Sequence, residues 1–108
     1  MTNTLKILGQ TANTASLTTL YTVGSGVQST VSTLVACNTG STPTTFSVSV
    51  AISGATDTIS QYLYYGVPIN GNDTFAATLG LTLGSTDVVR VKSANGACSF
   101  SAFGIEKA

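Results

Sequence analysis

Charge is what this sequence has least of. Four of its 108 residues are Lys or Arg and four are Asp or Glu, so charged residues make up 7% of the chain, against about 25% in an average domain. The formal net charge is zero. Such a chain offers no basic surface for nucleic acid or for an anionic membrane. A weakly charged surface associates readily with other proteins, so we expect protein partners, with neither nucleic acid nor membrane among them.

Histidine is absent altogether, which removes the commonest general base, the Ser-His triads and most zinc sites. The acidic residues are Asp57, Asp73, Asp87 and Glu106. Each Asp follows a turn-like run and precedes a strand, as is typical of a side chain that caps its own turn. A shared calcium site is the less favoured alternative, because no EF-hand spacing supports it. The sequence therefore predicts no catalytic residue, no metal site and no cofactor, and hence a protein that is not an enzyme.

Cysteine is scarce too, since Cys37 and Cys98 are too few for a disulfide scaffold. The opening Met-Thr-Asn-Thr-Leu-Lys-Ile-Leu lacks the apolar segment and cleavage site of a signal peptide. No apolar run approaches the roughly 20 residues of a membrane span. We therefore expect cytoplasmic synthesis and two free thiols that lie in the core, where they could be neighbours without bonding.

Short strands fill the chain, and no segment has a helical hydrophobic stripe. A short first strand, 5–10, is apolar at Leu5, Ile7 and Leu8. The strand 28–38 places Val31, Thr33, Val35 and Cys37 on one face by simple alternation. The strongest alternation follows that strand, with the apolar face formed by Phe46, Val48, Val50 and Ile52.

The strongest turn signal is Asn95-Gly96, the preferred pair for a two-residue hairpin turn. A hairpin of 88–94 with 97–103 would place Val91 opposite Phe100 and Ser93 opposite Cys98. Its inner face would comprise Val89, Val91, Cys98 and Phe100, and its outer face Arg90, Lys92, Ser99 and Ser101. We interpret the two basic side chains as aids to solubility and edge protection.

About eight short strands predict an all-β fold, an antiparallel β-sandwich of jelly-roll or Ig-like type, in a single domain, 1–108. A small β-barrel is the alternative. The predicted core includes the residues with the most regular alternation, Val48, Val50, Ile52, Val89, Val91 and Phe100.

Three of the four tyrosines fall in the stretch 61–75. Because successive strand residues point to opposite sides, Tyr62, Leu63 and Tyr64 cannot all enter one core. We expect Leu63 to face the core, and we hypothesise that Tyr62 and Tyr64 face a neighbouring subunit, since tyrosine is enriched where proteins meet. Stacking of Tyr62, Tyr64 and Tyr65 on sugars is the less favoured alternative.

The chain resembles a group of small structural proteins of tailed bacteriophages, cyanophages among them. The segments that carry the resemblance span most of the chain: Ile-Leu-Gly-Gln at 7–10, Leu-Tyr-Thr-Val at 20–23, Val-Ser-Thr-Leu-Val-Ala-Cys-Asn at 31–38, Tyr-Leu-Tyr-Tyr-Gly-Val-Pro-Ile-Asn-Gly-Asn-Asp-Thr-Phe at 62–75, Leu-Thr-Leu-Gly-Ser-Thr-Asp-Val-Val at 81–89, and Phe-Gly near the end.

The resemblance implies a virion component. Small β-sandwich proteins of this group often act as capsid decoration (cement) proteins, trimeric where capsomers meet, so the implied partners are copies of this chain in a homotrimer and a phage major capsid protein or another virion protein. A tail, neck or baseplate protein, with adhesive carbohydrate binding, is the alternative. The resemblance identifies no catalytic residue.

Overall fold

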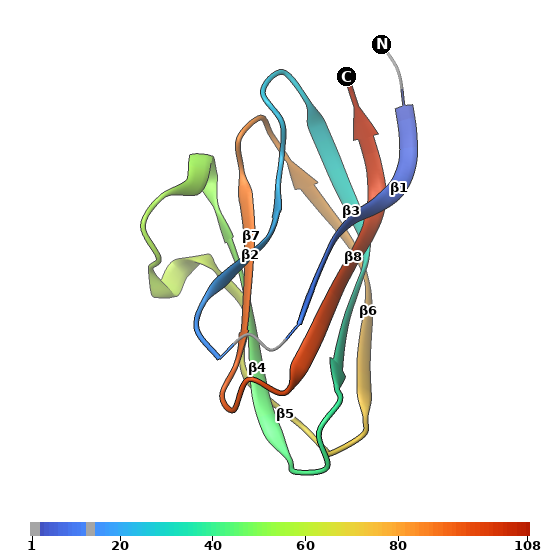
Figure 1. The fold of residues 1–108 in the computed structure, drawn as a ribbon. Coiled ribbons are helices and arrows are strands. Elements are labelled where there is room, and N and C mark those ends of the chain that lie inside the picture. The colour runs from blue at the N-terminus through green and yellow to red at the C-terminus, as the bar shows by residue number, and fades with distance from the viewer. Residues whose placement is uncertain (1–2, 13–14) are drawn as a thin grey trace.

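Eight strands and two single-turn 3₁₀ helices make up the regular structure in a computed structural model that describes residues 3–12 and 15–108 (Figure 1). The elements, in chain order, are β1 (Asn3–Ala12), β2 (Thr18–Thr22), β3 (Gln28–Asn38), β4 (Thr44–Ala51), η1 (Ile52–Gly54), η2 (Ile59–Gln61), β5 (Tyr62–Ile69), β6 (Thr74–Leu83), β7 (Val88–Ser93) and β8 (Cys98–Lys107). Across those described ranges, no helix is long and apolar enough to cross a membrane.

The strands form two antiparallel four-stranded sheets packed face to face. Sheet A has the order β1-β8-β3-β6 and sheet B the order β2-β7-β4-β5. Strand β1 pairs with β8, β2 with β7, β3 with β6 and β4 with β5, and the roll is completed by the pairs β3–β8 and β4–β7. A long antiparallel ribbon rolled up in this way is a jelly roll. The predicted β-sandwich is confirmed, in its jelly-roll form.

The predicted hairpin at Asn95-Gly96 is wrong. Strand β7 lies between β2 and β4 in sheet B, whereas β8 lies between β1 and β3 in sheet A, so the turn links two sheets. Only Gly96 of the pair has a positive φ, 73°, whereas a type I′ turn needs two. The Asn95 amide donates to the Thr44 hydroxyl, and its side-chain oxygen accepts from the Ala97 amide. Strand β7 pairs with β2 and β4, and β8 pairs with β1 and β3. The hydrogen bonds to these two partners on each side outweigh the local preference of Asn95-Gly96 for a hairpin turn.

The faces predicted for that hairpin are nevertheless correct, because both strands turn the expected side chains inward. Phe46 is the centre of the aromatic core, with its ring centroid 5.1 Å from that of Phe75 and 6.3 Å from those of Tyr64 and Phe100. Of the predicted core, the buried members are Val48, Val89, Val91 and Phe100, and Val50 is half-buried against them.

Ile52 was predicted to lie in the core and is instead 77% exposed. Strand β4 ends at Ala51, and Ser53 adopts φ 51° inside η1, which carries the chain away from sheet B. Regular alternation does not indicate where a strand ends, so the predicted core face continues one residue beyond the end of β4.

A bulge at Ser32 reverses the faces of β3. Val31 opposes Gly104 and Thr33 opposes Phe103, which leaves Ser32 unpaired with β8. Beyond it the buried residues are Leu34, Ala36 and Asn38, while Val35 and Cys37 face outward from sheet A. The expectation that Cys37 lies in the core beside Cys98 is therefore wrong: Cys37 is half-buried on the outer face, and Cys98 is buried. Both thiols are free, as predicted.

Candidate interaction surfaces

The tyrosine stretch is reorganised by two register shifts between β4 and β5. Tyr62 opposes Ser49, and Tyr64 opposes Val48. Tyr64 therefore points inward, onto Phe46 and Phe75. Leu63 falls at the shift and is 45% exposed, so the expectation that Leu63 faces the core is wrong. A β-bulge re-aims the side chains around it, which period-two reasoning cannot anticipate.

Tyr62 lies on the outer face of sheet B, as expected. Its hydroxyl donates to an Asp57 carboxylate oxygen 2.9 Å away, and its ring meets that of Tyr65 edge-on with centroids 5.0 Å apart. Burial and the nearby Asp57 carboxylate raise the pKa of Tyr62 above its ordinary value. An interface role for Tyr62 and Tyr64 stays a prediction, and the structure adds the exposed side chains Leu63 and Tyr65 to it.

Residues 52–61, named here the excursion, project from the outer side of sheet B before β5 begins (Figure 1). The Arg90 guanidinium donates to the carbonyl oxygens of Gly54 and Ala55, at 3.0 and 2.8 Å. An Asp87 carboxylate oxygen accepts from the Ser53 amide at 3.0 Å. Arg90 therefore holds the excursion on the sheet. Because β7 lies between β2 and β4, the interpretation of its basic side chains as edge protection is wrong.

Large apolar side chains are exposed on the same flank. They are Ile52, Ile59, Leu63 and Tyr65, with exposed fractions of 77%, 71%, 45% and 64%, and are named here the β5 patch. The other exposed large hydrophobic residues of the described chain are Leu5 and Ile7, on β1. These two lie opposite Ile105 and Phe103, half-buried residues on the outer face of sheet A. We name Leu5, Ile7, Phe103 and Ile105 the β1 patch.

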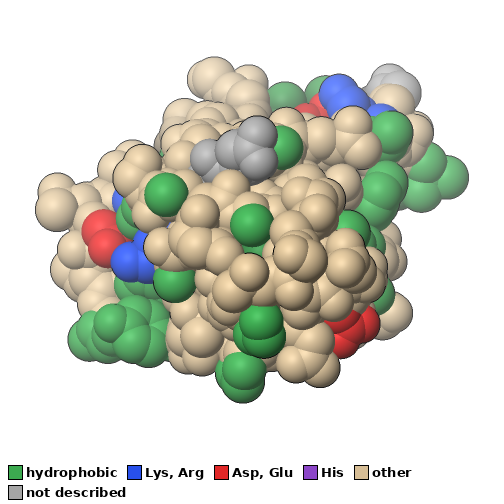
Figure 2. Space-filling model, turned by 60° about the horizontal axis from the view of Figure 1, so that its bottom comes forward, with side chains coloured by type: hydrophobic (Ala, Val, Ile, Leu, Met, Phe, Trp, Pro, Cys, Tyr) green, Lys and Arg blue, Asp and Glu red, His purple; other side chains and the backbone are tan. Residues whose placement is uncertain are grey.

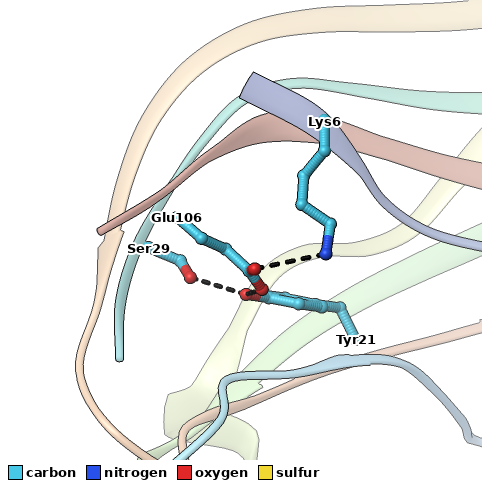
Figure 3. A network of polar contacts seen from close by, with 4 residues as sticks. All are labelled: Lys6, Tyr21, Ser29 and Glu106. Carbon is cyan, nitrogen blue, oxygen red and sulfur yellow. Dashed lines mark hydrogen bonds and ion pairs between the residues drawn. The ribbon is translucent and has the colours of Figure 1, made fainter. Parts of the chain in front are cut away.

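A polar cluster of four side chains joins the two sheets (Figure 3). Two of its members, Lys6 and Glu106, are sequence neighbours of residues in the β1 patch. The Tyr21 hydroxyl, from sheet B, donates to a Glu106 carboxylate oxygen at 2.5 Å. The bond to Glu106 uses the one proton of the Tyr21 hydroxyl. The Ser29 hydroxyl must therefore donate to the Tyr21 oxygen, which lies 2.5 Å away. Lys6 pairs with the other Glu106 oxygen at 3.2 Å. No sequence pattern predicts this cluster, because its members come from four separate strands.

The electrostatics of the cluster follow from its contacts. Burial, with the hydrogen bond to Glu106, raises the pKa of Tyr21 to about 12. The hydrogen bond from Tyr21, together with Lys6, holds the pKa of Glu106 below its ordinary value. Both shifts favour one arrangement, a neutral phenol that donates to an ionised carboxylate, so the cluster is a polar tie between the two sheets.

The remaining acids act locally. Asp87 accepts from the Gly84 amide at 2.8 Å and Asp73 from the Thr74 amide at 2.8 Å, so both cap turns as predicted. Asp57 instead accepts from Tyr62. Within residues 3–12 and 15–108, no three His, Cys, Asp or Glu side chains gather where they could hold a metal ion.

The fold and surfaces together define a small jelly roll. Most of its few charged side chains form hydrogen bonds or ion pairs within the fold, and large apolar side chains are exposed at two flanks. No protein-family model matches the chain, and no curated protein is similar to it in sequence. One solved chain of the same fold belongs to the acidic stable capsid structure of Helicobacter pylori bacteriophage KHP30, with a TM-score of 0.53 and 16% identity. The match covers 98% of this chain and 87% of that one, so the likeness joins two whole chains of similar length.

Proposed function

We propose that this protein is a non-enzymatic structural component of a phage virion, a capsid decoration (cement) protein that binds the outside of the shell and stabilises it. The observation that carries the proposal is the shared fold, over nearly all of both chains, with a chain of the KHP30 capsid structure. Jelly rolls recur in viral capsid domains, but also in lectins and cupins, so the fold alone does not define a function.

The surface supports a covered, structural role. Large exposed hydrophobic side chains on two flanks mark protein contact sites more often than free surface. The outer face of sheet A adds a broad area of small uncharged side chains, among them Thr33, Ala76, Thr78 and Ser101, all at least partly exposed. Interface centres are depleted of charged residues in the same way.

The partners in this proposal are further copies of the chain, a trimer by the phage resemblance, and the major capsid protein of the shell. The test is the copy number of the chain in purified particles, measured by quantitative mass spectrometry against the shell subunit, with its position determined by cryo-electron microscopy. A fixed ratio to the shell subunit, with density on the outside of the capsid, is the expected result. A few copies at the tail or neck would replace the decoration role by the tail alternative, and absence from the particle would overturn both.

A further inference from the structure

The two apolar patches look in opposite directions. In β8, Phe103 stands between the inward-facing residues Ala102 and Gly104, so Phe103 faces outward from sheet A. Ile7 lies opposite Phe103 in the paired strand, so the β1 patch faces outward as well. Tyr65 follows the inward residue Tyr64 and therefore faces outward from sheet B, and the other members of the β5 patch are exposed on the excursion and at the start of β5. Figure 2 shows hydrophobic side chains standing out at the left flank, on the side of the excursion, and at the right flank, on the side of β1. One neighbour in a fixed position cannot cover both patches.

The shapes of the two flanks are complementary. The excursion stands out from the body of the sandwich on the side of the β5 patch (Figure 1). A depression of about 550 Å³ lies beside the β1 patch, and its lining includes Gln28, Thr30, Thr82, Ile105 and Lys107. Ile105 belongs to the β1 patch as well, so the depression and the patch form one continuous surface. A projection on one flank and a recess on the other suit contact between successive copies.

The charges on the two flanks are complementary as well. Lys107 is exposed on the outer face of sheet A, two residues beyond Ile105. The exposed carboxylate beside the β5 patch is that of Asp57, which receives the hydroxyl of Tyr62, the ring neighbour of Tyr65. Two cations lie on the same face of sheet B. Arg90 is half-buried and engaged by two carbonyl oxygens, and Lys92 lines a shallow depression together with Tyr65.

These observations discriminate between the two ways in which copies can meet. A two-fold contact places a patch on itself, which would bring two Lys107 side chains together at the β1 patch and would leave the other patch bare. A head-to-tail contact covers both patches with one repeated interface, and it brings Asp57 toward Lys107 instead. Opposite charges across a contact favour it, and like charges oppose it.

The geometry points to a head-to-tail contact in which the β5 patch and excursion of one copy sit on the β1 patch and its depression in the next copy. The contact deepens the proposed virion role by identifying how copies join, but it does not depend on that role. Self-association is measured on the free protein without any shell, so failure of the contact and failure of the capsid role give different results.

The test uses one double variant for each patch. Leu5→Ser with Ile7→Ser removes the β1 patch, and Ile59→Ser with Leu63→Ser removes the β5 patch. The control is Ser41→Ala with Thr42→Ser, two exposed positions between β3 and β4 that belong to neither patch. Light scattering over a range of protein concentrations measures association, and thermal unfolding verifies that each variant is folded.

The parent and the control should associate, and each patch variant alone should have a dissociation constant raised at least about tenfold, since loss of an interface anchor costs at least that much. An equimolar mixture of the two variants should form a dimer, because each retains the patch that the other lacks. A monomeric parent would overturn the inference. So would a mixture that stays monomeric, or a patch variant that associates like the parent.

Charge reversal provides a second test if a serine variant fails to fold. Asp57→Lys and Lys107→Glu change exposed residues and should each weaken association of the chain. The two changes in one chain should restore it, because every head-to-tail contact then contains one reversed charge from each side. Equal weakening in the combined variant, or no weakening in either single one, would contradict the proposed arrangement.

Discussion

On each of the two flanks of this sandwich, a charged side chain holds two parts of the fold together, but one flank uses a guanidinium and the other a carboxylate. On the β5 side, a guanidinium holds the excursion through main-chain carbonyl oxygens. On the β1 side, a carboxylate joins the sheets by accepting from Tyr21 and pairing with Lys6. In both places these charges are engaged by polar groups of the fold, while large apolar side chains nearby are exposed. The difference is that the guanidinium keeps its charge at every accessible pH, whereas the carboxylate does not.

The largest effect should come from the aromatic core that both flanks share. Phe100→Ala should lower the free energy of unfolding by about 3–5 kcal/mol, because a fully buried ring is removed and a cavity remains. Phe103→Ala on the same strand is the matched control, since Phe103 is only half-buried on the outer face. Denaturant unfolding measures both. An equal loss in the two variants would mean that the inner and outer faces of β8 are assigned wrongly.

Removing the Tyr21 hydroxyl from the polar cluster on the β1 side should have the second largest effect on stability. Tyr21→Phe keeps the buried ring but deletes the donor to Glu106, so the free energy of unfolding should fall by about 1.5–3 kcal/mol at neutral pH, the range for a hydrogen bond to a charged group. Tyr62→Phe is the control on the other flank, where the hydroxyl bonds to an exposed Asp57. It should change stability much less.

The same tie should make stability depend on pH at both extremes. The lowered pKa of Glu106 means that its contribution is present above the ordinary value of about 4.3 and is lost as the pH falls through the folded value. The raised pKa of Tyr21 means that its contribution is present below about 10 and is lost as the pH rises toward about 12. Stability curves of the parent and of Glu106→Gln should converge at acid pH, and curves that stay parallel there would contradict the tie.

Loosening the β5 side should have a local effect. Arg90→Lys keeps the charge but loses the fork that donates to two carbonyl oxygens. The excursion should then be cleaved faster by a protease at low concentration, and the free energy of unfolding should fall by about 1 kcal/mol. Lys92→Arg, on the same face of β7, is the control and should leave the cleavage rate unchanged. Unchanged cleavage in Arg90→Lys would show that other contacts hold the excursion.

The smallest effect concerns two neighbouring serines on the outer side of β4. The Ser47 hydroxyl accepts from the Gly66 amide at 3.0 Å, whereas the fully buried Ser49 hydroxyl has no hydrogen-bond partner among the described residues. Ser49→Ala should therefore be neutral or stabilising by up to about 1 kcal/mol, and Ser47→Ala should be destabilising by a similar amount. Thermal unfolding of the two variants side by side measures the difference, and the reverse order would contradict these contacts.

Sequence reasoning succeeded where alternation is regular and local. The buried faces of β7 and β8, around Val91 and Phe100, follow from period two alone. It failed where the chain departs from period two, at the Ser32 bulge and at the shifts around Leu63. It also failed for Asn95-Gly96, because the partners of β7 and β8 come from distant parts of the chain. Contacts of that kind, like the Tyr21–Glu106 tie, leave no local pattern.

In the proposed virion role, neighbouring subunits cover both exposed apolar patches. Hydroxyl-radical footprinting of the chain in purified particles, compared with the dilute free protein, tests it directly. We expect strong protection of peptides that contain Leu5 and Ile7 and of those that contain Ile59, Leu63 and Tyr65. Equal reactivity of both patches in the particle and in the free protein would contradict it.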